Sequence, residues 1–243
     1  VRNYILRNFY KRFFYFLPIG INSRKHYLSK GVPDEKMSIV RYSIDFEFFK
    51  KQVNKWLKKR DQIREFFKIK NNDHVFIFVG KIFEAKNPIL IAKALSKIDK
   101  QKLKEIWLIV IGDGFLRQEF EYECKKILGE TAVFVGFKNQ TEIGKYYACA
   151  DTLILPSKRG ETWGLVVNEA LQYNLSVILS DNVGSAKDLV SNDDFGFIFK
   201  NNDPDDLRKC ILLSLNKKIS IKRDSICPHP NELSEMISNI IFK

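Results

Sequence analysis

The sequence has few residues of the kinds that bind metals or form disulfide frameworks. Its 243 residues include three histidines and four cysteines. The cysteines, at positions 124, 149, 210 and 227, form no Cys-x-x-Cys pair, and the histidines stand far apart. These spacings fit neither a zinc site nor a disulfide-stapled domain, and they favour a reducing, cytosolic setting.

Targeting segments and long apolar runs are missing as well. No apolar run approaches the ~20 residues that a membrane-spanning helix needs, and no signal peptide is visible. The first residue is Val1 rather than methionine, so we expect the polypeptide to begin upstream. A Gly-x-Gly-x-x-Gly fingerprint is absent, and Gly112, Asp113 and Gly114 give only weak support for NAD binding.

A positive charge is present in excess. The chain carries 41 lysines and arginines against 29 aspartates and glutamates, a net charge of +12, which attracts anionic partners. The basic residues are spread widely and form no recognised nucleic-acid motif, so we expect no nucleic-acid partner. Hydrophobic residues make up 45% of the chain, which is typical of a globular protein with one good core.

From residue 74 onwards, short apolar segments alternate with helical patterns. The segments are residues 74–79, 106–111, 132–135, 152–155, 177–180 and 196–199. Such alternation forms right-handed βαβ units, which predicts an α/β, Rossmann-like parallel sheet with helices on both faces. Ligands of these sheets bind at the carboxyl ends of the strands. Residues 46–67 predict one amphipathic helix before the first strand.

The most informative motif is residues 160–170, which read GETWGLVVNEA. We predict a loop followed by a helix over residues 164–172, whose amino end favours a bound phosphate. Glu161 and Glu169 lean toward that end, and because carboxylates repel phosphates, hydroxyl groups are their better partners. A diphosphate flanked by sugar hydroxyls is a nucleotide sugar. Helix capping by these acids is the simpler alternative that spacing leaves open.

Two lysines follow the first predicted strand. Lys81 and Lys86 lie in the loop before a helix predicted over residues 88–98. They are placed to hold a diphosphate through charge-assisted hydrogen bonds, whereas spacing by itself favours solvated surface lysines.

Together these motifs resemble the retaining GT-B glycosyltransferases of the "glycosyl transferases group 1" family. The hallmark Glu-x-x-Gly-Leu-x-x-x-Glu-Ala is matched by residues 161–170, and FVGKIFEAKNP matches the family's basic pair. Lys81 replaces the usual arginine of that pair, which keeps the charge but not the bidentate geometry. Asn174, Leu175 and Ser176 stand where the family has Gly-x-Pro, and because asparagine tolerates the left-handed conformation, we expect the turn to persist.

The resemblance implies how a donor diphosphate is held. Lys81 and Lys86 would grip the phosphates, together with the helix end formed by Gly164 and Leu165. With Glu161, Lys86 makes up the implied catalytic pair.

It also implies contacts to the rest of the donor. Glu161 would orient the sugar and Glu169 the ribose, while Phe137 and Gln140, in the segment FVGFKNQ, would hold the base. We expect no metal and no other cofactor. Asp203-Pro204-Asp205 mimics the metal motif of the unrelated GT-A enzymes, but the proline fits a helix cap and first turn better.

The same resemblance divides the chain. Residues 1–42 match the end of the N-terminal acceptor domain, residues 43–220 the donor-binding domain, and residues 221–243 a C-terminal helix that crosses back. Within the first part we predict helices over residues 2–12 and 23–30, the latter capped by Asn22 or Ser23, and strands over residues 13–19 and 37–40. The basic, aromatic helix over residues 2–12 either lies on a membrane surface or packs within a globular domain.

We therefore expect the donor-binding part of a retaining, hexosyl-type glycosyltransferase. It moves a sugar from a nucleoside-diphosphate sugar to a hydroxyl of a sugar, lipid-linked or glycan acceptor, in the cytoplasm or at the inner face of a membrane. Activity should require an N-terminal domain, on the same polypeptide or a partner chain. The rivals are a non-catalytic nucleotide-sugar-binding subunit or truncated remnant and, more distantly, a sugar-nucleotide epimerase of the same fold.

Overall fold

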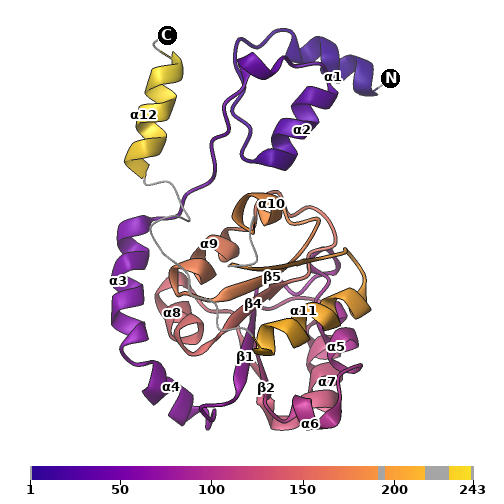
Figure 1. Ribbon diagram of the computed structural model, residues 1–243, viewed down its shortest axis with the longest axis vertical. Coiled ribbons are helices and arrows are strands. Elements are labelled where there is room, and N and C mark those ends of the chain that lie inside the picture. Colours follow the sequence, from indigo (N-terminus) through magenta and orange to yellow (C-terminus); the bar gives the residue numbers. More distant parts are fainter. Residues whose placement is uncertain (1, 191–194, 217–229, 242–243) are drawn as a thin grey trace.

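A parallel sheet lies at the centre of the computed structural model, which describes residues 2–190, 195–216 and 230–241 (Figure 1). Its strand order is β3-β2-β1-β4-β5-β6, and every neighbouring pair is parallel. The strands are β1 (His74–Val79), β2 (Ile106–Ile111), β3 (Ala132–Gly136), β4 (Thr152–Leu155), β5 (Ser176–Ser180) and β6 (Gly196–Phe199). The predicted Rossmann-like α/β sheet is confirmed.

Helices cover both faces of this sheet. One face packs against α3 (Phe46–Leu57), α4 (Arg60–Phe66), α8 (Gln140–Cys149), α9 (Leu165–Gln172) and α10 (Ala186–Leu189). The other packs against α5 (Ile89–Leu95), α7 (Arg117–Leu128) and α11 (Pro204–Asn216). Strand side chains alternate between the two cores, so that Val75 and Ile77 face the first and Phe76 and Phe78 the second.

Short elements join the larger ones. The helix α6 (Lys100–Leu103) and the 3-10 turns η2 (Glu84–Lys86) and η3 (Gly129–Thr131) lie in connections of the sheet domain, and η1 (Asp34–Lys36) lies in the N-terminal part. Asn174 has a φ of 60° after α9, so the expected left-handed turn is present.

The single helix predicted over residues 46–67 is wrong, because the structure has α3 and α4 with a break at Lys58 and Lys59. Asp45 caps α3 by accepting a hydrogen bond from the Phe48 amide at 2.9 Å. The break redirects the chain, so that α3 packs Phe49 and Val53 into the core while α4 turns its arginines toward the amino ends of the strands.

The N-terminal part has two helices, α1 (Arg2–Tyr10) and α2 (Ile21–Ser29). The strands predicted over residues 13–19 and 37–40 are wrong, since a single parallel bridge joins Phe16 to Met37. Within the described chain no third strand lies beside these two short segments, and an isolated pair of short strands is too weak to form a regular sheet. The predicted side-chain cap is wrong as well: Gly20 precedes α2, and the Ile21 amide donates instead to the Asp188 carboxylate at 3.0 Å.

This N-terminal part lies beyond the carboxyl ends of the strands, above α10 in Figure 1. Phe16, Val32 and Met37 form a small buried cluster of its own. The last helix, α12 (Pro230–Ile241), lies at the same end of the molecule, while residues 217–229, which lead to it, lie outside the described residues. None of the described helices combines the length and the apolar character needed to cross a bilayer.

Candidate functional site

The strand order reverses between β1 and β4, which lie side by side at the middle of the sheet. From this point β2 and β3 extend to one side, and β5 and β6 to the other. Open α/β sheets bind ligands in the crevice outside such a switch point. The loops that leave β1 and β4 meet there, because the Lys158 amide donates to the Ala85 carbonyl at 2.8 Å.

The loop after β4 ends at the amino end of α9. Gly164 is the residue before the helix and has a φ of 90°, a conformation that glycine adopts without strain. Gly184 lets the segment after β5 pack closely against this loop, since a Cβ atom there would lie 1.8 Å from the Thr162 carbonyl oxygen. The amides of Gly184 and Ser185 donate to the carbonyls of Glu161 and Trp163 at 2.9 and 3.1 Å, which fixes the loop.

Glu161 and Lys86 meet at this switch point. Lys86, at the end of η2, forms an ion pair with Glu161 Oε2, and the Ser157 hydroxyl donates to the same oxygen at 2.9 Å. The side chains of Lys86 and Glu161 are 27% and 11% exposed, so both are half-buried or better yet open to a ligand. Gly164 lies beside the pair, because a Cβ atom there would be 3.5 Å from Glu161 Cγ.

Glu169 lies deeper, in the second turn of α9, and is 8% exposed. The hydroxyl of Tyr147, from α8, donates to Glu169 Oε2 at 2.9 Å. Burial raises the pKa of Glu169, and the hydrogen bond from Tyr147 opposes that shift only in part. The ionised form of Glu169 is therefore costly to bury, and further hydrogen-bond donors would stabilise it.

The other predicted donor residues are more exposed. Lys81 is exposed in the loop after β1, and Leu165 is 44% exposed at the first turn of α9. Phe137 is 75% exposed and Gln140 begins α8, both after the edge strand β3. The structure thus brings Lys86, Glu161 and Gly164 together. Phe137 and Gln140 follow β3, which is two strands away from β1 in the sheet.

Three residues of the site were not predicted as site residues. They are Ser157, which bonds Glu161, Tyr147, which bonds Glu169, and Trp163, whose Nε1 donates to the buried Asn168 Oδ1 at 2.8 Å. Ser157 follows the β4 segment by two positions, so its place near a strand end was a usable signal. Nothing local marks Tyr147, because its partner is 22 positions away.

Asp203 caps a helix, as predicted for this motif. Its carboxylate accepts from the amides of Asp205 and Asp206 at 3.0 and 3.1 Å, at the start of α11, and Asp205 pairs with Lys97 at 2.6 Å. Across the described ranges, no three His, Cys, Asp or Glu side chains gather where they could hold a metal ion.

Fold and site together define a doubly wound α/β protein with a lysine, a carboxylate and the amino end of a helix at its switch point. The family model described as "Glycosyl transferases group 1" matches residues 59–227. The chain belongs to this glycosyltransferase family.

Curated relatives match over part of their length. The chain is 27% identical over 187 residues to UDP-Gal:alpha-D-GlcNAc-diphosphoundecaprenol alpha-1,3-galactosyltransferase of Escherichia coli, covering 76% of this chain and 46% of that protein. It is 30% identical over 145 residues to a diNAcBac-PP-undecaprenol-linked alpha-1,4-N-acetyl-D-galactosaminyltransferase of Campylobacter jejuni, covering 59% and 39%. The chain therefore spans less than half the length of these relatives.

Solved structures share the fold. Anabaena Alr3699/HepE in complex with UDP superposes with a TM-score of 0.78 at 16% identity, covering 99% of this chain and 67% of that one. The C-terminal domain of a glycosyl transferase group 1 family protein from Francisella tularensis gives a TM-score of 0.55 at 21% identity, covering 65% and 83%. The GT-B type of architecture is thereby confirmed.

Proposed function

We propose that this chain is the donor-binding part of a retaining glycosyltransferase that takes a hexosyl-type sugar from a nucleoside-diphosphate sugar. The observation that carries the proposal is the meeting of Lys86, Glu161 and the amino end of α9 at the switch point, with the buried Glu169 on the same helix. A cation and a helix end suit a diphosphate, and the two carboxylates suit hydroxyl groups on either side of it.

The proposed chemistry is positioning and charge stabilisation. Lys86 exchanges Glu161 for the donor diphosphate, and the amides at the start of α9 add further donors as negative charge develops on the leaving group. Glu161 keeps the hydrogen bond from Ser157 and becomes an acceptor for the hydroxyls of the donor sugar. Lys81, Leu165, Phe137 and Gln140 complete the donor contacts.

The acceptor side is proposed from two observations. The Escherichia coli relative is named for a diphosphoundecaprenol-linked substrate, which favours a sugar, lipid-linked or glycan acceptor for this chain. Tyr4 and Phe14 are 72% and 86% exposed in the N-terminal part, where a further domain, a partner chain or a membrane surface can cover them. We place the reaction in the cytoplasm, with peripheral contact at the inner face of a membrane.

Titration calorimetry of the purified chain tests donor binding. The titrants are UDP, ADP and GDP, and then the sugar derivatives of whichever diphosphate binds. We expect one nucleoside diphosphate to bind, and its affinity to persist in a chelator, because Lys86 and the helix end provide the positive charge. Loss of binding on chelation, with return on adding manganese, contradicts the metal-free site and makes Asp203 and Asp205 candidate ligands.

A transfer assay separates the enzyme from its rival, a non-catalytic nucleotide-sugar-binding subunit. We expect the 243-residue chain to bind donor but to transfer nothing unaided, because water is excluded and the acceptor is held only when two domains close. Transfer should appear when an acceptor domain is supplied. Light scattering should show association through the exposed aromatic side chains of the N-terminal part. A well-behaved monomer that glycosylates an acceptor alone contradicts this view.

A further inference from the structure

Glu169 has a single side-chain partner in the described part of the chain. The Tyr147 hydroxyl donates to Oε2 at 2.9 Å, and no described side chain or amide bonds Oε1. An ionised carboxylate has about four acceptor positions, so most of the hydrogen-bonding capacity of Glu169 is unused. The remaining positions are available to a ligand that reaches the 8% of Glu169 that stays exposed.

Tyr147 is held rigidly where it meets Glu169. It is fully buried in α8, and its ring stacks on that of Tyr173 with centroids 5.4 Å apart and planes at 25°. Tyr173 follows α9, the helix that carries Glu169, so the two rings join α8 to α9. A ring fixed in this way gives its hydroxyl one direction, toward Oε2.

We infer that Tyr147 is the positioning residue of the ribose site: by holding Oε2 of Glu169, it presents Oε1 to the hydroxyl groups of the donor ribose. The inference rests on the proposed function, in which Glu169 meets the ribose. It assigns to α8 a part in choosing between ribose and deoxyribose, although Tyr147 itself is buried and touches no ligand.

The electrostatics of the buried carboxylate support this role. Burial raises the pKa of Glu169, and the Tyr147 hydrogen bond lowers it. The same burial, together with the Glu169 charge, keeps the pKa of Tyr147 well above its ordinary value, so the phenol stays a donor at neutral pH. Removal of the hydroxyl therefore leaves a carboxylate that is harder to ionise and free to rotate.

The test compares ribo- and 2′-deoxyribonucleoside diphosphates by calorimetry, with UDP, ADP and GDP as probes. The wild-type chain should bind the ribo form of its preferred diphosphate roughly tenfold more tightly than the deoxy form, the value of one hydrogen bond to a charged group. Tyr147→Phe should reduce this ratio to about twofold, mainly by weakening the ribo form. Because both ligands meet the same folded fraction, the ratio is independent of any loss of stability.

Tyr173→Phe is the matched control. It removes a hydroxyl from the other ring of the same stack, one that makes no hydrogen bond to Glu169, and it should leave the ratio unchanged. In a Glu169→Ala background, Tyr147→Phe should have no further effect on the ratio. A wild-type ribose preference that survives in Tyr147→Phe overturns the inference alone, whereas failure of every probe to bind overturns the proposed function with it.

Discussion

The buried charged groups at the two ends of the sheet differ in how many hydrogen bonds they make. At the amino end, Arg64 is 7% exposed and donates to the carbonyls of Cys149, Lys70 and Asp73 at 3.1, 2.9 and 2.7 Å, and to Asp151 at 3.2 Å. At the carboxyl end, Glu169 is as buried, and among the described residues it has one hydrogen-bond partner. A saturated cluster stabilises the fold, and an unsaturated one has capacity left for a ligand.

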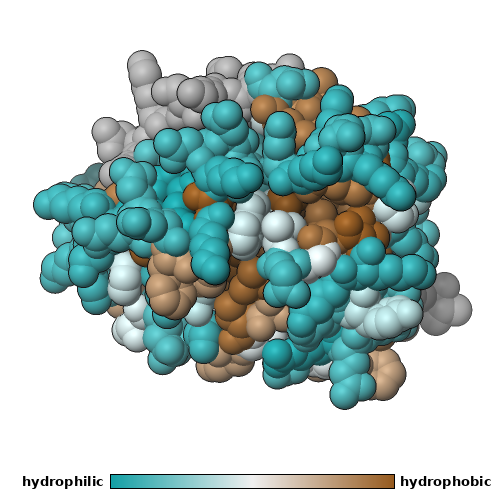
Figure 2. Space-filling model, turned by 90° about the horizontal axis from the view of Figure 1, so that it is seen from below, coloured by the Kyte–Doolittle hydropathy of each residue, from teal (hydrophilic) through white to brown (hydrophobic). Residues whose placement is uncertain are grey.

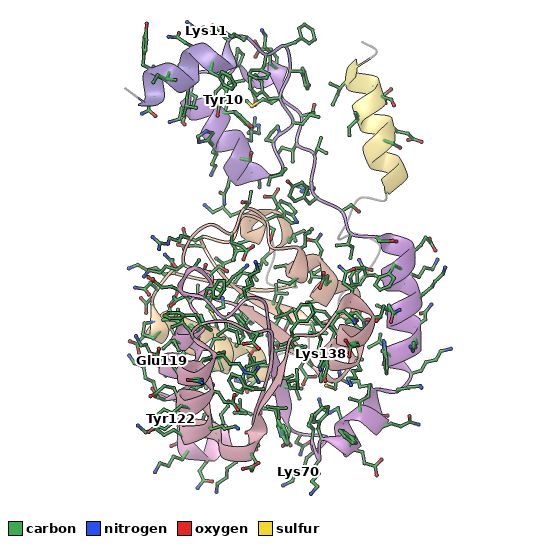
Figure 3. The ribbon with its side chains drawn as sticks, turned by 180° about the vertical axis from the view of Figure 1, so that it is seen from behind. Tyr10, Lys11, Lys70, Glu119, Tyr122 and Lys138 are labelled. Atoms are coloured by element: carbon green, nitrogen blue, oxygen red, sulfur yellow. The ribbon has the colours of Figure 1, made fainter. Side chains whose placement is uncertain are left out.

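The surroundings of the two ends agree with this difference. Seen from below in Figure 2, the amino end presents mainly hydrophilic side chains around a smaller apolar area. Figure 3 places Lys70, whose carbonyl accepts from Arg64, at this end, and Tyr10 and Lys11 at the opposite one. Within the described residues, three buried side-chain atoms have no hydrogen-bond partner, Gln172 Nε2, Ser185 Oγ and Asn201 Oδ1, and the last two follow β5 and β6 at the carboxyl end.

The largest effect on stability should come from Arg64→Met. It removes the donor for three carbonyls and leaves part of the Asp151 charge without its partner, which should cost about 3–5 kcal/mol of unfolding free energy. Denaturant unfolding measures the loss. Lys97→Met, which removes an exposed ion pair with Asp205, is the control and should cost less than about 1 kcal/mol. Equal losses of unfolding free energy in the two variants would show that the hydrogen bonds of Arg64 stabilise the fold no more than an exposed ion pair does.

Lys86→Ala should affect binding rather than folding. Loss of one charge-assisted contact should weaken the nucleoside diphosphate and its sugar derivative alike, by about 1.5–3 kcal/mol. Calorimetry measures both affinities. Lys93→Ala, an exposed change in the neighbouring α5, should alter neither. Unchanged affinities in Lys86→Ala would remove Lys86 from the site.

Glu161→Ala should discriminate between the two ligands. Because Glu161 is proposed to accept hydrogen bonds from the donor sugar, its loss should weaken the nucleotide sugar roughly tenfold more than the bare diphosphate. Glu84→Ala, which removes an exposed partner of Lys158, is the control and should change neither affinity. Equal losses for both ligands in Glu161→Ala are the result that speaks against sugar recognition.

The smallest and most specific effect concerns Glu169 and pH. Burial raises the pKa of this group above its unfolded value, so the folded state loses stability as pH rises through the folded pKa. Glu169→Gln is neutral throughout and should melt at a higher temperature than the wild type at pH 7.5, with the difference shrinking toward pH 4. Thermal melts at both pH values measure it. A wild type that is the more stable protein at pH 7.5 would show that its charge is already compensated.

Local patterns were sufficient for the fold class and the central motif. The continuous apolar runs of β1 and β4 marked buried strands, and the loop and helix that follow β4 were predicted with a helix start near Gly164. Lys86 and Glu161 were predicted as site residues from the resemblance of their motifs to the family, and the structure brings the two side chains together. The break between α3 and α4 was missed, because the apolar periodicity continues through it.

The sequence by itself therefore determined which segments become strands, in what order they alternate with helices, and which family the motif belongs to. Only the tertiary structure decided that β1 lies beside β4, that Lys86 pairs with Glu161 across 75 positions, and that Tyr147 bonds Glu169. Local propensity depends on neighbours along the chain, whereas the partner of a buried charge is chosen by packing between distant segments. For this protein, local sequence patterns locate the candidate site, and packing between distant segments sets the partners and the orientation of the groups within it.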